Sequence, residues 1–591
     1  MLPQQDEPDY IRLFIAIFMA ALLFMGWQRF VEWPRRQEMA QQVIQQEQEK
    51  RAEQRKEAAT LPGAATNESN PSLTRAQRIA LSPRIAIVSK TLRGSIALTG
   101  ARFDDLILAD YKETLAPHSP DVTLLSPAGG NDAYFTQIGW VSADGKTAVP
   151  GQRTLWQADR NTLSPGHAVT LRWDNGQGVT FILAVSLDDE YMFSVAQRVL
   201  NHSGHGISVI PYGYINRAYT ETGKPSAIIH EGPLGVMQGS LEEVSYKDLR
   251  EKGNRSYDDA SGWLGITDKY WLSALIPAEG HYKTSFRYYS ENGADRYQAD
   301  YLDGAQRINN GQSAGYDVRF FAGAKELGVL DAYAKGDGAH PPIPLFERAI
   351  DFGWLYLLSE PMLKTLSFFF IHAGNFGVAI LLLTIVVRLL LFPLANKSFH
   401  SMAQMRALTP EMQKIKARYA DDQITLQKEM LSLYKREKVN PASGCLPMLI
   451  QMPVFFALYK VLYVSIEMRH APFFGWIKDL SATDPSNIFT GFGLVPWDTP
   501  PWMHLGILPI AYCLTMIVQM KFQPTPADAT QAKVMKFMPY FLLFVFARMP
   551  AGLVLYWTCS NTLSIIQQRV ITVRHKDKMA RKTARQMPDA R

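Results

Sequence analysis

The chain has few cysteines and no recognisable catalytic set. It contains three cysteines in 591 residues, and all fall in the apolar runs of the C-terminal part: Cys445, Cys513 and Cys559. The long middle region has none, so disulfides cannot stabilise it. Within that region His202 and His205 have no further ligand at metal-binding spacing, and residues 188–190 form a carboxylate run typical of a solvated loop. We therefore predict no catalytic residue, no metal and no cofactor.

Long apolar runs are confined to two parts of the chain. The first covers residues 13–27, and the others lie between residues 366 and 573. The first run lacks both the basic flank and the small-residue site of a cleaved signal peptide, so residues 1–32 are predicted to be an uncleaved transmembrane signal anchor. Residues 33–80, rich in Gln, Glu, Lys and Arg before a Pro/Gly/Asn/Ser break, are predicted to be a charged tether and linker.

Short β-type runs fill most of the middle region. Examples are RIAIVS, VTLRW and VTFILAV, the last two separated by the turn sequence DNGQG at residues 174–178. Such runs without helical alternation predict a large β-sandwich, to which we assign residues 81–345. Apolar and aromatic residues at helical spacing then predict an amphipathic interfacial helix over residues 346–362.

One apolar stretch carries an unpaired charge. FGVAILLLTIVVRLLLFPLA (residues 376–395) has the length that crosses a bilayer core of about 30 Å, so residues 363–395 are assigned to a transmembrane helix. Placing the charge of Arg388 inside the membrane costs roughly 2.5–3.5 kcal/mol of free energy on insertion scales. Arg388 must either extend to an interface or face a wet cavity. No acidic residue in the apolar runs is available to pair with it, which favours a water-filled groove.

A polar segment and four further apolar helices follow. Residues 396–440 are predicted to form a helical hairpin, and residues 441–573 the remaining helices of a six-span protein. The hairpin, the 521–536 loop and the 574–591 tail are all basic, which places them in the cytoplasm and the β region outside. The hairpin is rich in methionine. These residues either pack the seam of two helices or offer an adaptable surface for apolar segments: Met402, Met405, Met412 and Met430.

Polar residues recur on one face of the last helix. Trp557, Ser560, Asn561, Ser564 and Gln568 share a single helical stripe. Polar side chains also occur on three earlier helices, namely Thr384, Arg388, Gln451 and Gln519. Polar groups in spans often join helices to one another. Here they also fit the lining of a groove.

Three segments resemble the YidC membrane-protein insertases of bacterial inner membranes. These are TIVVRLLLFPL (384–394), NPASGCLPMLIQMPVFFALYKVL (440–462) and KFMPYFLLFVFARMPAGLVLYWTCSNTLSIIQQ (536–568). The likeness covers residues 352–571, and the long β region resembles the Gram-negative type with a periplasmic β-supersandwich. Some relatives have tyrosine in place of Trp557.

The resemblance implies a cytoplasm-open groove that releases nascent segments laterally into lipid. Expected partners are nascent membrane proteins, the ribosome (through the hairpin and basic tail), the Sec translocon and the lipid bilayer, but not DNA. The expected location is the inner membrane, with a cytoplasmic C-terminus. The groove would be lined by Thr384, Arg388, Gln451, Gln519, Tyr556 and Trp557, to which the polar stripe adds Ser560 and Asn561.

Two other classes of protein fit the sequence less well. A transporter or channel predicts internal repeats and ionisable pairs near the membrane midplane, and the clustered apolar helices show neither. A membrane-anchored envelope enzyme or carbohydrate-binding protein would explain the β region, but that region has no convincing acid–base pair or metal set.

Overall fold

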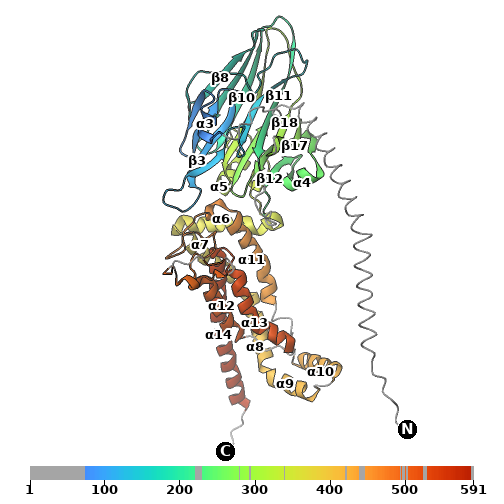
Figure 1. The fold of residues 1–591 in the computed structure, drawn as a ribbon. Coiled ribbons are helices and arrows are strands. Elements are labelled where there is room, and N and C mark those ends of the chain that lie inside the picture. The colour runs from blue at the N-terminus through green and yellow to red at the C-terminus, as the bar shows by residue number, and fades with distance from the viewer. Residues whose placement is uncertain are drawn as a thin grey trace, which may run out of the picture.

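The computed structural model describes residues 73–219, 229–278, 280–291, 294–338, 340–419, 422–437, 439, 446–492, 494–495, 499–500, 503–522 and 529–586. The predicted anchor (1–32) and most of the predicted tether (33–80) lie outside these residues. The described residues form a β domain at one end and a helical half at the other (Figure 1).

The β domain contains two sheets. The larger has the strand order β14-β17-β18-β11-β5-β3-β2-β1-β7, with β4 paired to β3 and β19 to β11. Its strands are β1 (Arg84–Val88), β2 (Leu92–Ala97), β3 (Arg102–Lys112), β4 (Asp121–Leu125), β5 (Tyr134–Ser142), β7 (Thr162–Leu163), β11 (Ile207–Ala218), β14 (Arg255–Ala260), β17 (Tyr282–Glu291), β18 (Ala294–Leu302) and β19 (Gln306–Ile308).

The second sheet has nine strands in the order β13-β12-β15-β16-β20-β10-β9-β8-β6. They are β6 (Gln157–Ala158), β8 (Val169–Asp174), β9 (Val179–Leu187), β10 (Met192–Asn201), β12 (Gly232–Met237), β13 (Ser240–Glu243), β15 (Gly262–Thr267), β16 (Trp271–Pro277) and β20 (Ser313–Ala324). The predicted DNGQG turn joins β8 to β9, which pair antiparallel. Strand β9 alternates buried positions with positions that are, with one exception, partly buried, as one face against a core requires.

Aromatic side chains join the two sheets. The ring of Phe103 on β3 lies 5.3 Å from that of Phe193 on β10 and 5.4 Å from that of Phe320 on β20. The sheets therefore pack face to face around a common core. Residues 188–190 and 202–205 lie in the turns that precede and follow β10, as the solvated-loop interpretation expected.

The helical elements are short in the β domain and longer in the C-terminal half. They are α3 (Arg75–Ile79), α4 (Tyr246–Lys252), α5 (Leu327–Lys335), α6 (Tyr356–Ala373), α7 (Phe376–Leu390), α8 (Phe392–Ala407), α9 (Thr409–Arg418), α10 (Gln423–Arg436), α11 (Leu446–Val464), α12 (Ile507–Met520), α13 (Ala529–Phe546) and α14 (Ala551–Gln586), with 3₁₀ turns η2 (Phe346–Ala349), η3 (Gly353–Leu355), η5 (Ile466–Met468) and η6 (Ile488–Thr490).

Several predicted helix boundaries are wrong. The expected interfacial helix at 346–362 is instead two 3₁₀ turns and the start of α6, because Gly353 adopts φ 59° and interrupts the helical path. The expected helix at 363–395 is split between α6 and α7. Gly374, with φ 66°, ends α6, and the Asn375 side chain caps α7 by accepting a hydrogen bond from the Val378 N–H at 3.1 Å.

The apolar stretch around Arg388 is also shorter than predicted. Helix α7 ends at Leu390, and α8 leaves it at an angle of 67°. Pro393 lies in the first turn of α8, where its missing N–H is tolerated, whereas in an unbroken helix it would remove a hydrogen bond.

Among the described residues, no single helix is both long and apolar enough to cross a bilayer, although α7 and α8 together satisfy that criterion as a bent pair. Residues 449–464 of α11 and helix α12 are shorter apolar helices.

Candidate functional site

Arg388, in the last turn of α7, points its guanidinium at α14. Its Nε donates a hydrogen bond to Ser560 Oγ at 3.0 Å, and its Nη2 donates to the Ser560 carbonyl at 2.8 Å. Ser560 is only 1% exposed, whereas Arg388 is half-buried. No carboxylate in the part of the chain that the structure describes lies within ion-pair distance of this guanidinium. The charge is therefore solvated by a hydroxyl, by a carbonyl and, on its exposed part, by the surrounding medium.

A second polar pair joins α11 to α14. Gln451 Nε2 donates a hydrogen bond to the hydroxyl of Tyr556, which lies one helical turn before Ser560. Tyr556 has no exposed surface and Gln451 is 8% exposed. Gln451 and Tyr556 are consequently buried more deeply than Arg388, which contacts α14 one turn further along.

The third connection runs between α14 and α12. Asn561 Nδ2 lies 3.5 Å from Thr515 Oγ1, and Gln519, half-buried, follows Thr515 by one turn. Thr515 was not identified from the sequence, although its spacing of four residues from Gln519 places both on one face. Thr384 is fully buried, and its hydroxyl donates to the Ile380 carbonyl of its own helix at 2.7 Å.

The side chain of Trp557 packs against other aromatic rings, whereas that of Ser560 contacts Arg388. Its ring lies 5.5 Å from Phe455 on α11, 6.1 Å from Tyr512 on α12 and 5.8 Å from Phe546 on α13. Its buried indole N–H has no hydrogen-bond partner among the described residues. The predicted single stripe on α14 is therefore divided: Ser560 meets α7, Asn561 meets α12, and Trp557 packs in an aromatic cluster.

Apolar packing closes the bundle on the side nearer the β domain. A Cβ on Gly552 would lie 3.1 Å from Ile380 Cδ1, 3.1 Å from the Leu480 carbonyl oxygen and 3.4 Å from Leu462 Cδ2. The Gly552 N–H donates to that Leu480 carbonyl at 2.9 Å. We call these four residues the outer seal. The polar groups of Arg388 and Ser560 lie two turns further along α14, away from the β domain.

The methionines of the hairpin are mostly buried. Met412 and Met430, each 8% exposed, form the α9–α10 seam together with Leu433. Met402 packs at the base of α8 against Ile571 of α14, and Met405 is half-buried. In this conformation Met412 and Met430 pack the seam between the two helices, which is one of the two interpretations that the sequence left open.

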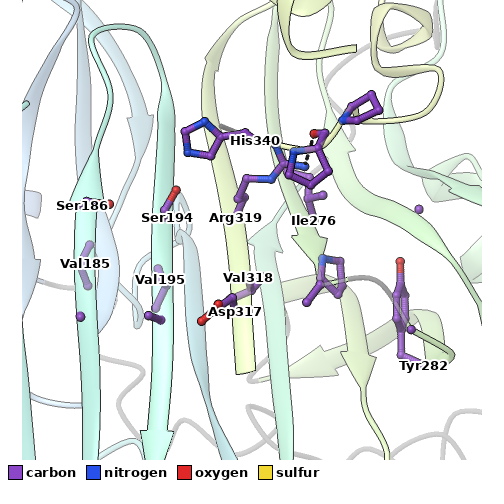
Figure 2. A pocket seen from close by; sticks show the side chains of 18 of the residues that line it. Val185, Ser186, Ser194, Val195, Ile276, Tyr282, Asp317, Val318, Arg319 and His340 are labelled. Atoms are coloured by element: carbon purple, nitrogen blue, oxygen red, sulfur yellow. Dashed lines mark hydrogen bonds between the residues drawn. The ribbon is translucent and has the colours of Figure 1, made fainter. Parts of the chain in front are cut away.

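The β domain contains a separate cleft of about 690 Å³, shown in Figure 2. It lies over β9, β10, β16 and β20 beside the 340–344 segment, where Arg319 Nη2 donates to the Pro341 carbonyl at 3.1 Å. Tyr282 is the one phenylalanine, tyrosine or tryptophan among its described lining residues, and it is 3% exposed. The buried Tyr282 ring therefore offers no exposed face on which a ligand could stack.

Comparisons with known proteins cover both halves of the chain. Residues 84–365 match the family described as the YidC periplasmic domain, and residues 368–578 match the family described as 60Kd inner membrane protein. The membrane protein insertase YidC of Rickettsia bellii is 46% identical over 497 residues, which is 84% of this chain and 88% of the relative. That of Rickettsia conorii is 47% identical over 490 residues, covering 83% and 87% of the two chains.

A crystal structure of an active YidC insertase with its first transmembrane domain resolved is 18% identical, covering 82% of this chain and 92% of that one with a TM-score of 0.35. At this level of superposition the assignment rests on the sequence matches. The chain belongs to the YidC family: it is a membrane protein insertase of the inner membrane, with a periplasmic domain, and not an enzyme.

Proposed function

We propose that α7, α11, α12 and α14 enclose a hydrophilic groove, open to the cytoplasm and to lipid, that receives nascent hydrophobic segments. The observation that supports this most strongly is the state of Arg388, which is half-buried among apolar helices and, within the described part of the chain, is hydrogen-bonded only to the hydroxyl and carbonyl of Ser560. A buried charge without a carboxylate is costly unless water reaches it. A wet groove supplies that water.

The groove would lower the barrier to insertion by shortening the hydrocarbon path. A polar flank that crosses an intact bilayer must lose its hydration over about 30 Å. Within the groove the flank would stay partly hydrated, and Arg388 would attract acidic residues through an electrostatic interaction that is stronger than in bulk water. The apolar part of the segment could then slide sideways into lipid without nucleotide hydrolysis.

The hairpin and the basic C-terminal segment would deliver substrates. Figure 1 places α9, α10 and the end of α14 at the end of the molecule away from the β domain, an arrangement that fits a shared cytoplasmic side. We infer that this end meets the ribosome and that the protein acts alone or with the Sec translocon. Because Met412 and Met430 are buried, their use in capture requires the seam to open, whereas Met405 is already partly accessible.

The proposal is tested by varying the charge of position 388 and of the substrate together. We expect Arg388→Ala to reduce insertion of a single-span protein with an acidic flank by about tenfold, the effect of losing roughly 1.4 kcal/mol of attraction. Arg388→Lys should restore most of it. Lys112→Ala, which removes an exposed cation from the β domain, is the matched control. Equal losses for acidic and neutral flanks would contradict the electrostatic role.

A further inference from the structure

The β domain is joined to the outer end of α11 by a half-buried carboxylate. After α11 the chain passes through η5, in which Ile466 and Met468 are 2% and 0% exposed. Between them, Glu467 Oε1 accepts a hydrogen bond from the Leu327 N–H at 3.0 Å, and Oε2 accepts one from the Ser465 hydroxyl at 2.5 Å. Leu327 is the first residue of α5, so a residue from the helical half caps a helix of the β domain.

Helix α5 has no local substitute for this cap. Glu326, which precedes it, makes no side-chain capping bond. Its Oε1 atom accepts instead from the hydroxyls of Tyr111 at 2.9 Å and Tyr191 at 2.8 Å. Burial raises the pKa of Glu467, while its hydrogen bonds with Ser465 and Leu327 oppose that rise. The Glu467–Leu327 bond is therefore a specific connection across 140 residues of sequence.

Two basic residues at the outer end of α11 and just after it strengthen the same junction. Arg469 donates from Nη2 to the Glu113 carbonyl at 3.1 Å, and its guanidinium carbon lies 5.4 Å from the centre of the Trp271 ring. Lys460, on the outer part of α11, forms an ion pair with Asp351 at 3.0 Å, and both side chains are largely buried. The contact is thus a packed interface and not a flexible tether.

The chain that follows Glu467 forms part of the outer seal. Leu480, 13 positions further on, is fully buried and accepts the hydrogen bond from Gly552. Near it, the Ala482 carbonyl accepts from the Ala551 N–H at 2.7 Å. The same segment places Phe473 against Gly377 of α7. The segment that begins at Glu467 therefore covers the starts of both α7 and α14.

We propose that Glu467 is a positioning residue: by capping α5 it fixes this segment to the β domain and so keeps the outer seal closed above the groove. The inference rests on the proposed groove. It gives the β domain a part in sealing, separate from insertion itself, that needs no ligand, because the domain would act as the rigid support for the seal. An insertase with a cytoplasm-open cavity must prevent that cavity from opening to the periplasm, and this connection would do so.

The test uses the full-length protein in intact cells, with Cys445 and Cys513 replaced by serine so that Cys559 on α14 is the remaining thiol. A membrane-impermeant maleimide added outside reports whether the seal is open, and a permeant maleimide confirms that Cys559 can react in every variant. We expect Glu467→Ala to raise the outside labelling rate about tenfold, as loss of a helix cap and of both hydrogen bonds to Glu467 implies.

Three variants separate positioning from general destabilisation. Glu467→Gln keeps one oxygen to accept from the Leu327 N–H, while its amide N–H can donate to the Ser465 hydroxyl oxygen, so it should label as slowly as the parent. Ser465→Ala removes one bond to Glu467 and should give a smaller rise. Glu113→Ala removes an exposed carboxylate at the same junction while leaving the carbonyl that binds Arg469, and it should not change the rate.

The outcomes distinguish this inference from the groove itself. If Glu467→Ala labels no faster than Glu113→Ala, Glu467 does not hold the seal, and the groove remains. If Glu467→Gln labels as fast as Glu467→Ala, the capping argument is wrong. If Cys559 of the otherwise unchanged protein is already labelled rapidly from outside, the outer seal is not closed, and the proposed groove geometry is refuted together with this inference.

Discussion

Replacing Ser560 with alanine distinguishes a wet groove from a dry one. The substitution removes the hydroxyl that Arg388 Nε contacts at 3.0 Å but leaves the carbonyl at 2.8 Å. In a dry interior, losing a hydrogen bond to a charged group costs about 1.5–3 kcal/mol. Where water can take the hydroxyl's place, the cost falls below about 1 kcal/mol. Because Arg388 is half-buried, we expect the smaller value.

Tyr556→Phe is the matched control. It removes the hydroxyl that accepts from Gln451, but here both partners are at most 8% exposed, so the amide N–H is left buried without a partner. That situation costs about 1–3 kcal/mol. The free energy of unfolding of both variants, measured in one mixed-micelle denaturation series, should therefore fall further for Tyr556→Phe. A loss for Ser560→Ala equal to or greater than that for Tyr556→Phe would mean that water does not reach Arg388.

Three further predictions concern other parts of the molecule. Deleting residues 101–323 should spare most insertion in a reconstituted assay, whereas deleting the hairpin between Met412 and Met430 should not; equal losses would place the mechanism outside the membrane half. Gly552→Leu should abolish insertion and lower thermal stability, since even a Cβ there meets Ile380 and the Leu480 carbonyl at 3.1 Å. Burial lowers the pKa of Lys325 to about 8 from 10.5. Between about pH 8 and pH 10.5 the unfolded chain therefore binds a proton that the folded chain lacks. The free energy of unfolding of the β domain, measured by urea titration, should rise by up to about 3 kcal/mol as the pH increases across that range, but not in Lys325→Met.

Local structure was predictable where a short segment determines it. The DNGQG turn at 174–178 follows from turn chemistry, and the structure confirms it. The bend between α7 and α8 was not predicted, because the hydropathy of residues 376–395 is uniform and Pro393 was taken as part of one span. Gly374 and Asn375 are residue types that end and begin helices, but the apolar residues on both sides of them favoured one continuous span.

The site was predictable as a set of residue types but not as a set of contacts. Helical periodicity placed Ser560 and Trp557 on one stripe, yet a stripe wide enough to meet several neighbours does not say which residue meets which helix. The bond from Arg388 to Ser560 spans 172 residues, and the bond from Leu327 to Glu467 spans 140. Only the packing of the bundle brings such partners together, so sequence spacing could not identify them.

The most direct test of the groove is photocrosslinking from α12 with Arg388 intact. A photoreactive residue at Gln519, one turn from the Asn561–Thr515 contact, should form an adduct with a ribosome-bound single-span protein. The same residue at Leu514, 58% exposed on another face of α12, is the control for contact from lipid. We expect adducts from position 519 to exceed those from position 514 and to diminish in Arg388→Ala. Equal or absent adducts at 519 would contradict a substrate groove at Arg388.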